Sequence, residues 1–186
     1  MNVVLVSGAI LVLILFPIIY IIAQYNGLIS LRNHMTESWS DIDTELKRRY
    51  ELIPNLVATV KAYAAHEREV LERVTQLRTL CSTTHGSPAH QSASENQLST
   101  ALRQLLATVE SYPVLKADEG YRQLQEELVT TENRIQAARR FFNGNVRDYR
   151  NKREAFPSNL IASAFHFGDA EFFEVEPAVR ELPTVR

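Results

Sequence analysis

Apolar residues recur at helical spacing along most of the chain, and no segment shows the sustained alternation typical of a strand. The pattern opens with an uncharged apolar run over residues 3–23, which is long enough to cross a bilayer as a helix. Pro17 is compatible with this, because membrane helices tolerate proline. We predict a single-pass transmembrane anchor over residues 1–25. A cleavable signal peptide is the alternative, but no basic residue precedes the run.

Four further apolar stripes predict four helices, over residues 28–53, 56–77, 98–109 and 121–149. The segment 82–96 contains many Ser and Thr residues with Gly and Pro, and is predicted to be a loop. Asp118 is predicted to cap the last long helix. The predicted fold is all-α: the anchor, then an antiparallel up-down-up-down four-helix bundle over residues 26–155. In that order the chain after Tyr149 returns towards the membrane.

Pro54 divides the first two stripes. One helix from Leu28 through Pro54 to Leu80 would be about 80 Å long. The later helices would be too short to cover its apolar stripe. Proline is well accepted in the first turn of a helix. We therefore predict a turn at Pro54, with Arg49 and Asn55 holding it through side-chain hydrogen bonds; a binding role for these two residues is the alternative. A single kinked helix is the alternative.

An aromatic-rich segment over residues 156–175 follows the predicted bundle, and a flexible tail is predicted at 176–186. Clusters of this apolar density mark interfaces when they are exposed. Three interpretations compete: packing back on the bundle, contact with a partner or another copy, and insertion at the membrane interface. The candidate contact residues are Phe165, Phe167, Phe172 and Phe173.

Two other features suggest roles. Trp39, the only tryptophan, lies on the first stripe and is predicted to be a buried core anchor rather than a partner-binding residue. A basic patch comes near the returning end of the chain, where it would face either an anionic leaflet or water at a helix terminus. Its members are Arg147, Arg150, Lys152 and Arg153.

The sequence lacks the features of several functional classes. The 20 basic and 22 acidic residues are nearly balanced, which argues against a general nucleic-acid-binding protein. The string "HERE" at 66–69 lacks the second histidine of the zinc-protease motif, because position 70 is valine. Cys81 has no activating neighbour in the sequence, and the six glycines form no phosphate-binding loop. We predict no enzyme activity, metal, cofactor or small-molecule substrate.

The strings "YNGLISLRNHMTESWSDID" and "TENRIQAARRFFNGNVRDYRNKREAFPSNLIA" resemble the LemA family of bacterial membrane proteins. The resemblance extends from Tyr25 to about Glu174. It implies an N-terminal membrane segment, a helical bundle and no assigned catalytic activity. The expected function is therefore a membrane-anchored scaffold or adaptor that holds a protein partner or self-assembles. A regulatory component acting on a membrane protease or sensor is the alternative.

The resemblance also implies the inner membrane of a bacterial cell. Arg32, Lys47, Arg48 and Arg49 follow the apolar run and no basic residue precedes it. The positive-inside rule then favours a cytoplasmic location for the rest of the chain, with the periplasm as the alternative.

Overall fold

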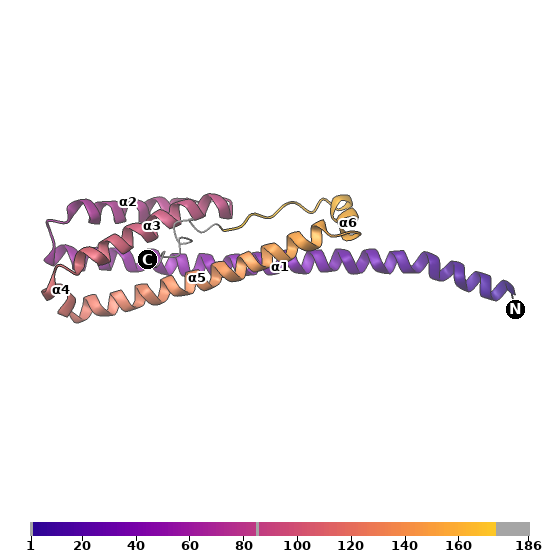
Figure 1. The fold of residues 1–186 in the computed structure, drawn as a ribbon, viewed down its shortest axis with the longest axis horizontal. Coiled ribbons are helices and arrows are strands. Elements are labelled where there is room, and N and C mark those ends of the chain that lie inside the picture. The colour runs from indigo at the N-terminus through magenta and orange to yellow at the C-terminus, as the bar shows by residue number, and fades with distance from the viewer. Residues whose placement is uncertain (1, 85, 174–186) are drawn as a thin grey trace, which may run out of the picture. The chain divides into compact units, whose positions relative to one another are not determined.

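The structure is a computed structural model that describes residues 2–84 and 86–173, so the tail predicted at 176–186 lies outside the described residues. Those described form six helices and no strand, which confirms the all-α prediction. The helices are α1 (Asn2–Tyr63), α2 (Arg68–Thr83), α3 (Pro88–Val109), α4 (Pro113–Ala117), α5 (Glu119–Glu154) and α6 (Ser158–Ala164) (Figure 1).

The chain divides into two compact units that are not consecutive in sequence. Unit 1 contains residues 2–38 and Gly144–Ala170. Unit 2 contains Trp39–Asn143 and the described residues 171–173. The long helices α1 and α5 therefore each contribute to both units.

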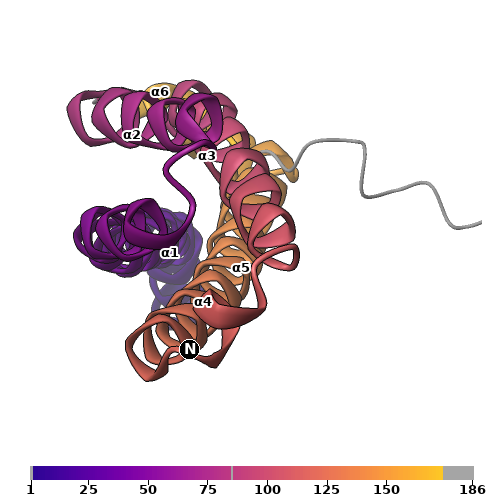
Figure 2. The same ribbon diagram turned by 90° about the vertical axis from the view of Figure 1, so that its left-hand side faces the viewer.

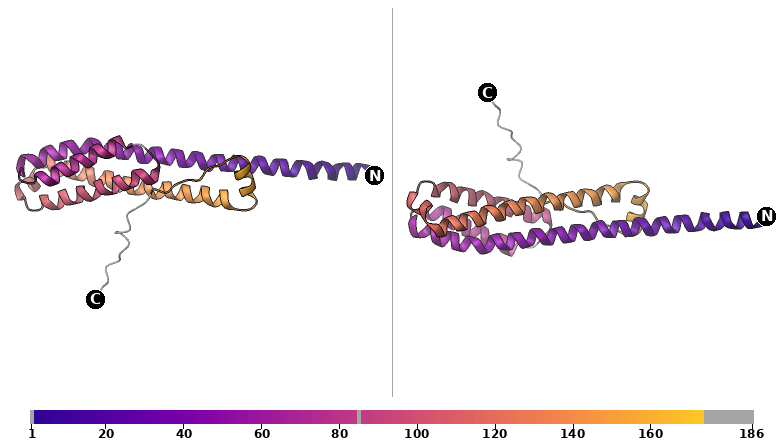
Figure 3. Two further views of the ribbon diagram at one scale, coloured as in Figure 1. Left: turned by 90° about the horizontal axis from the view of Figure 1, so that it is seen from above. Right: turned by 90° about the horizontal axis from the view of Figure 1, so that it is seen from below.

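Unit 1 begins with the apolar run, in which large aliphatic and phenylalanine side chains from Ile10 onward are exposed. The apolar side chains between Ile10 and Ile22 have exposed fractions of 41% to 77%. Beyond the run, Leu28 on α1, Tyr149 on α5, and Ala162 and Phe167 form a buried core. The chain after Tyr149 therefore packs beside the part of α1 that follows the apolar run, and Figure 3 shows α6 next to α1.

Unit 2 buries the apolar stripes of its helices against one another. Helices α2 and α3 lie side by side, as Figure 2 shows. The buried members of these stripes are Ile42, Leu46, Ile53, Leu56 and Val60 of α1, Val74 and Leu77 of α2, Leu98, Leu102 and Leu105 of α3, and Tyr121, Leu128 and Ile135 of α5. The spacing of three and four residues along each helix directs these side chains to one face.

The predicted turn at Pro54 is wrong, because α1 continues unbroken through this residue to Tyr63. Pro54 has no N–H to donate to the carbonyl of Tyr50, four residues earlier. Instead the Nε–H of Arg78 on α2 donates to that carbonyl at 3.2 Å. The chain leaves the helix only after Tyr63, and α2 begins at Arg68. A side chain from a neighbouring helix thus stabilises a proline position that local rules alone disfavour.

The loop predicted at 82–96 is also wrong for most of its length. Helix α3 begins at Pro88, and the Ser87 side chain accepts a hydrogen bond from the His90 backbone N–H, capping the helix. Ser and Pro mark the start of a helix here rather than a long connection.

The predicted cap at Asp118 is confirmed: its carboxylate accepts a hydrogen bond from the Tyr121 backbone N–H at 2.8 Å.

Candidate functional site

A buried charge network lies in the middle of unit 2, and the sequence analysis did not predict it. We define it as Arg49 and Tyr50 of α1, Glu95 and Ser99 of α3, and Glu132 of α5. The Arg49 guanidinium, fully buried, donates to Glu95 and also to Ser99 and Glu132, both at 2.8 Å. The Tyr50 hydroxyl donates to the other oxygen of Glu95. One arginine thus joins three helices.

The predicted role of Arg49 in a turn at Pro54 is therefore wrong. Its side chain belongs to the charge network, and Asn55 is exposed on the surface of α1. A sequence signal for the network did exist. Arg49 falls on the stripe formed by Leu46 and Ile53, at a position where an apolar residue is expected.

Interactions between the charged side chains of the network shift their pKa values. Burial acts to lower the pKa of Arg49, but Glu132 and Glu95 outweigh it and the pKa lies above its usual value. Burial acts to raise the pKa of Glu132, but the charge and hydrogen bonds of Arg49 outweigh it, so this pKa is lowered. Both residues therefore stay charged near neutral pH, where the ion pair is complete.

A second arginine, Arg139 of α5, is buried close to the network. Its Nη1 donates to the Asn96 side-chain oxygen at 3.2 Å, while its Nε and Nη2 have no hydrogen-bond partner among the described residues. The guanidinium carbon lies 4.4 Å from the ring centroid of Phe173. Burial, and then repulsion from Arg49, lowers the pKa of Arg139 to about 10. The aromatic face compensates part of the hydration that this cation loses.

The Asn143 side chain holds Phe173 by two hydrogen bonds. The Asn143 amide donates to the Phe173 carbonyl at 3.0 Å and accepts from the Phe173 N–H at 2.9 Å. The Phe173 ring is fully buried, with the Trp39 ring centroid at 5.5 Å. Trp39 itself is half-buried rather than buried, and its ring centroid also lies 5.4 Å from that of Phe142.

The four predicted contact residues are divided between the two units. Phe165 and Phe167 belong to unit 1, and Phe172 and Phe173 to unit 2. Phe165 is exposed and Phe172 half-buried, whereas Phe167 and Phe173 are buried. Phe167 and Phe173 therefore do not serve as exposed contacts. Their rings pack inside the chain, as in the interpretation in which this segment packs back.

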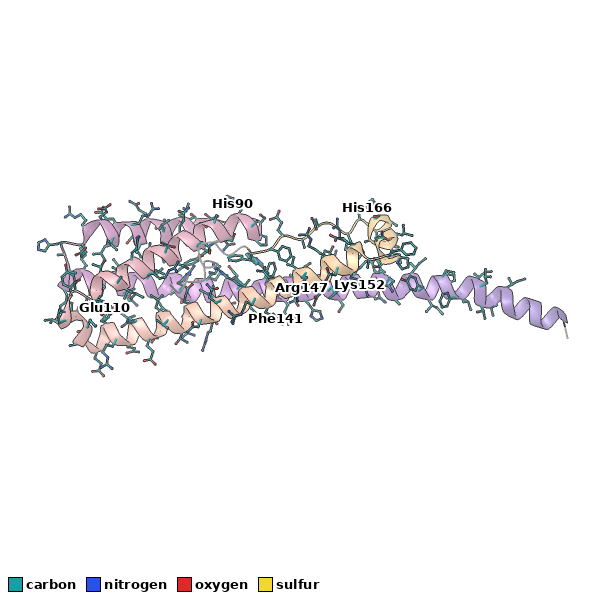
Figure 4. All side chains as sticks on the ribbon, viewed as in Figure 1. His90, Glu110, Phe141, Arg147, Lys152 and His166 are labelled. Carbon is teal, nitrogen blue, oxygen red and sulfur yellow. The ribbon has the colours of Figure 1, made fainter. Side chains whose placement is uncertain are left out.

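The basic patch is largely engaged with neighbouring groups. Arg153 donates to the Phe167 carbonyl at 3.1 Å and to Asp169 at 3.2 Å, and Arg150 lies 3.5 Å from the same carboxylate. Lys152 and Arg147 are visible on the last turns of α5 in Figure 4.

The other two basic residues also have neighbours within unit 1. Lys152 lies across α1 at Gly27, where an added Cβ would come within 2.3 Å of Nζ. Arg147 is exposed and lies 3.7 Å from Asp148. The basic residues therefore attach the end of α5 to the segment that follows α6. Fewer of their charges are free to bind another molecule than the sequence suggests.

The side chains of the network and of the basic patch link helices of the chain to one another. No group of three or more metal-ligating side chains occurs among the described residues. Cys81 is buried, and burial together with the charge of Glu95 raises the pKa of its thiol to about 12, which suppresses the nucleophilic thiolate.

The profile of the LemA family matches residues 38–186, which is most of the chain. The chain belongs to the LemA family. Its similar relatives include magnetosome protein MamQ 2 of Paramagnetospirillum magneticum, 24% identical over 85% of this chain and 67% of the relative. Magnetosome protein MamQ of Magnetospirillum gryphiswaldense is 22% identical over the same shares. Protein LemA of Metamycoplasma hominis is 25% identical over 89% of this chain and 75% of the relative.

These relatives come from bacteria, and α1 is a helix long and apolar enough to cross a membrane. The exposure of its apolar run distinguishes it from the buried core helix of a soluble protein. Together the findings indicate a bacterial membrane protein of the LemA family.

Proposed function

We propose that this protein is a non-catalytic, membrane-anchored scaffold or adaptor that holds a protein partner, or further copies of itself, at the bacterial membrane. The observation that carries the proposal is the continuity of α1. The same helix bears the exposed apolar run and, farther along, Arg49 of the charge network. Anything that binds unit 2 is thereby attached to the bilayer through an unbroken helix.

Unit 2 is, in this proposal, an antiparallel four-helix bundle made from the later part of α1, α2, α3 and the earlier part of α5. The network supports this arrangement, since Arg49 contacts both α3 and α5 and Arg78 ties α2 to α1. The bundle is the rigid element of the scaffold. Buried Arg49 favours one register, because a helix slip would separate its charge from Glu95 and Glu132.

A non-catalytic role is favoured by where the perturbed groups lie. Arg49, Tyr50 and Cys81 have shifted pKa values, but all three are buried structural positions. The names of the family and of the relatives carry no enzyme activity. The magnetosome relatives support membrane association here and nothing more specific.

Unit 2 lies in the cytoplasm in this proposal, because Arg32, Lys47 and Arg48 follow the apolar run. An impermeant maleimide distinguishes the two sides. A cysteine placed at exposed Glu37 should be labelled in everted membrane vesicles and protected in intact spheroplasts. Labelling in spheroplasts would place the domain in the periplasm.

The surface of unit 2 offers a place to test for a partner. Phe141 is an exposed aromatic residue on α5, and Figure 4 shows it on that helix. Chemical crosslinking in intact membranes, followed by affinity purification and mass spectrometry, should capture a stoichiometric partner or a ladder of this chain. The product should decrease in Phe141→Gln and persist in Val114→Gln, which changes an exposed apolar residue on α4.

The possible products separate the functions. A ladder made only of this chain supports a self-assembling scaffold, and a single heterologous partner supports an adaptor. A partner whose own activity changes on removal of this protein supports the regulatory alternative. Absence of any crosslinked product from membranes that contain the protein would overturn the scaffold and adaptor proposals together.

A further inference from the structure

We propose that the segment from Phe156 to Phe165, which we call the α6 corner, rests in the bilayer–water interface and makes a second, shallow contact with lipid. The ligand is the surface of the bilayer itself, contacted through apolar side chains. This inference rests on the proposed membrane insertion of α1. It adds to that function, because a second contact would fix the orientation of the anchored domain relative to the membrane.

The first step is the depth of Tyr25. The apolar run over residues 3–23 measures about 32 Å as a helix, close to the hydrocarbon thickness of a bilayer. Tyr25 follows the run by two residues, at the level where tyrosine rings concentrate. Its ring centroid lies 4.9 Å from that of Phe165 and 5.6 Å from that of Phe167. Phe165 therefore lies at the depth of the interface.

The second step is the exposure of the α6 corner. Phe156, Leu160 and Phe165 are 79%, 61% and 53% exposed, although all three are large and apolar. Over the same stretch Ile161 and Ala162 are buried, and Ala162 belongs to the core formed with Leu28 and Tyr149. Part of the corner thus packs inward while three large apolar side chains remain on its surface. Of these three, Phe165 contacts α1 directly, through Tyr25 just after the apolar run.

The third step is that the α6 corner is held in place. Phe167 packs with Leu28 and Tyr149, and the Tyr149 hydroxyl donates to the Gly168 carbonyl at 2.8 Å. The Nε–H of Arg153 donates to the Phe167 carbonyl at 3.1 Å. These contacts join the segment after α6 to both α1 and α5. The corner therefore keeps its depth whenever α1 is inserted.

The chemistry of the α6 corner favours lipid over a charged partner. Four cations lie near the corner, and two of them, Arg150 and Arg153, share the carboxylate of Asp169. The other two are Arg32 and Lys152. Electrostatic attraction to an anionic surface is thereby reduced, while the apolar area remains. A short segment with exposed aromatic and aliphatic side chains beside a membrane helix has the properties of an interfacial contact.

The test measures depth in the full-length protein in phosphatidylcholine nanodiscs. Single cysteines replace Leu160, Ile19 and Glu37, and each variant carries an environment-sensitive fluorophore. Native Cys81 is buried and does not compete for the label. Lipids with a nitroxide on the upper acyl chain then quench each fluorophore according to its proximity. Ile19 reports insertion of α1, and Glu37 reports a point about 18 Å beyond Tyr25 along the helix.

The label at Leu160→Cys should be quenched at least about half as strongly as that at Ile19→Cys, and far more than that at Glu37→Cys. Equal, weak quenching at positions 160 and 37, with strong quenching at 19, would overturn the α6-corner proposal while preserving the anchor. Weak quenching at position 19 would overturn the anchor itself, and with it this inference. Phe156→Cys provides an independent repeat, because its side chain is exposed and its replacement leaves the inner packing intact.

Discussion

Arg78 on α2 donates its Nε–H to the carbonyl of Tyr50, the backbone acceptor that Pro54 leaves without its helical donor. The proline lies in the interior of α1, nine residues before its end. A helix interior does not ordinarily accept proline without a kink or a substitute donor. Arg78 supplies that donor and joins α2 to α1 at the same point.

Replacing Arg78 by methionine should destabilise the protein by about 1–3 kcal/mol, because a carbonyl near the core loses its partner. The loss should shrink when Pro54 is also changed to alanine, whose N–H can bond to Tyr50 directly. Thermal unfolding of the detergent-solubilised full-length protein measures the four members of this cycle. Arg73→Met on the exposed side of α2 is the control. Equal losses in both backgrounds would disprove the coupling.

Removing Arg49 should be much more damaging than removing a surface lysine. Arg49→Met leaves Glu95 buried and unpaired, which costs about 3–5 kcal/mol. Lys47→Met breaks only an exposed ion pair with Asp43 and should cost far less. Urea or thermal unfolding followed by circular dichroism compares the two. Adding Glu95→Leu to Arg49→Met should recover part of the loss, which would separate unpaired charge from lost packing.

Stability should fall in acid through Glu132. Its pKa is lowered in the folded state, so it binds a proton less readily than in the unfolded chain, and its contribution is complete above the ordinary carboxyl pKa of 4.5. That contribution disappears as the pH falls through the lowered pKa. Melting temperatures measured from pH 3 to 7 should decline more steeply for wild type than for Glu132→Gln. Parallel curves would contradict the assignment.

Cys81 should be inert in the folded protein. Burial and the nearby charge of Glu95 raise its pKa to about 12, so little thiolate exists at pH 8. Iodoacetamide should modify it only after denaturation, as intact-mass spectrometry would show. A cysteine introduced at exposed Glu37 provides the reactive comparison in the same molecule. Comparable modification rates at the two positions in the native state would contradict the buried placement.

The fluorescence of Trp39 should report whether Phe173 is docked, because the two ring centroids lie 5.5 Å apart. Asn143→Ala removes both hydrogen bonds to the Phe173 backbone, and Phe173→Ala removes a buried ring at a cost of about 3–5 kcal/mol. Both variants should shift tryptophan emission to longer wavelength as water reaches Trp39. Phe165→Ala, an exposed position in unit 1, should leave the emission unchanged. An unshifted spectrum in both Phe173→Ala and Asn143→Ala would disprove the docking.

The sequence by itself determined the all-helical class, the exposed apolar run, the Asp118 cap and the family. Each of these depends on short-range information: helical spacing, an uninterrupted apolar stretch, a capping residue, or long similar strings. The stripes also placed residues such as Leu46 and Leu105 in the core correctly, because side chains three and four positions apart share one face.

Only the tertiary structure decided where α1 ends and what the charged stripe residues do. The donor that allows Pro54 inside a helix comes from Arg78, and the acceptors that allow Arg49 inside a core come from Glu95 and Glu132. These partners lie tens of residues away, so no local window contains both sides of the interaction. Burial then makes the pairing decisive, since an unpaired carbonyl or charge is costly away from water.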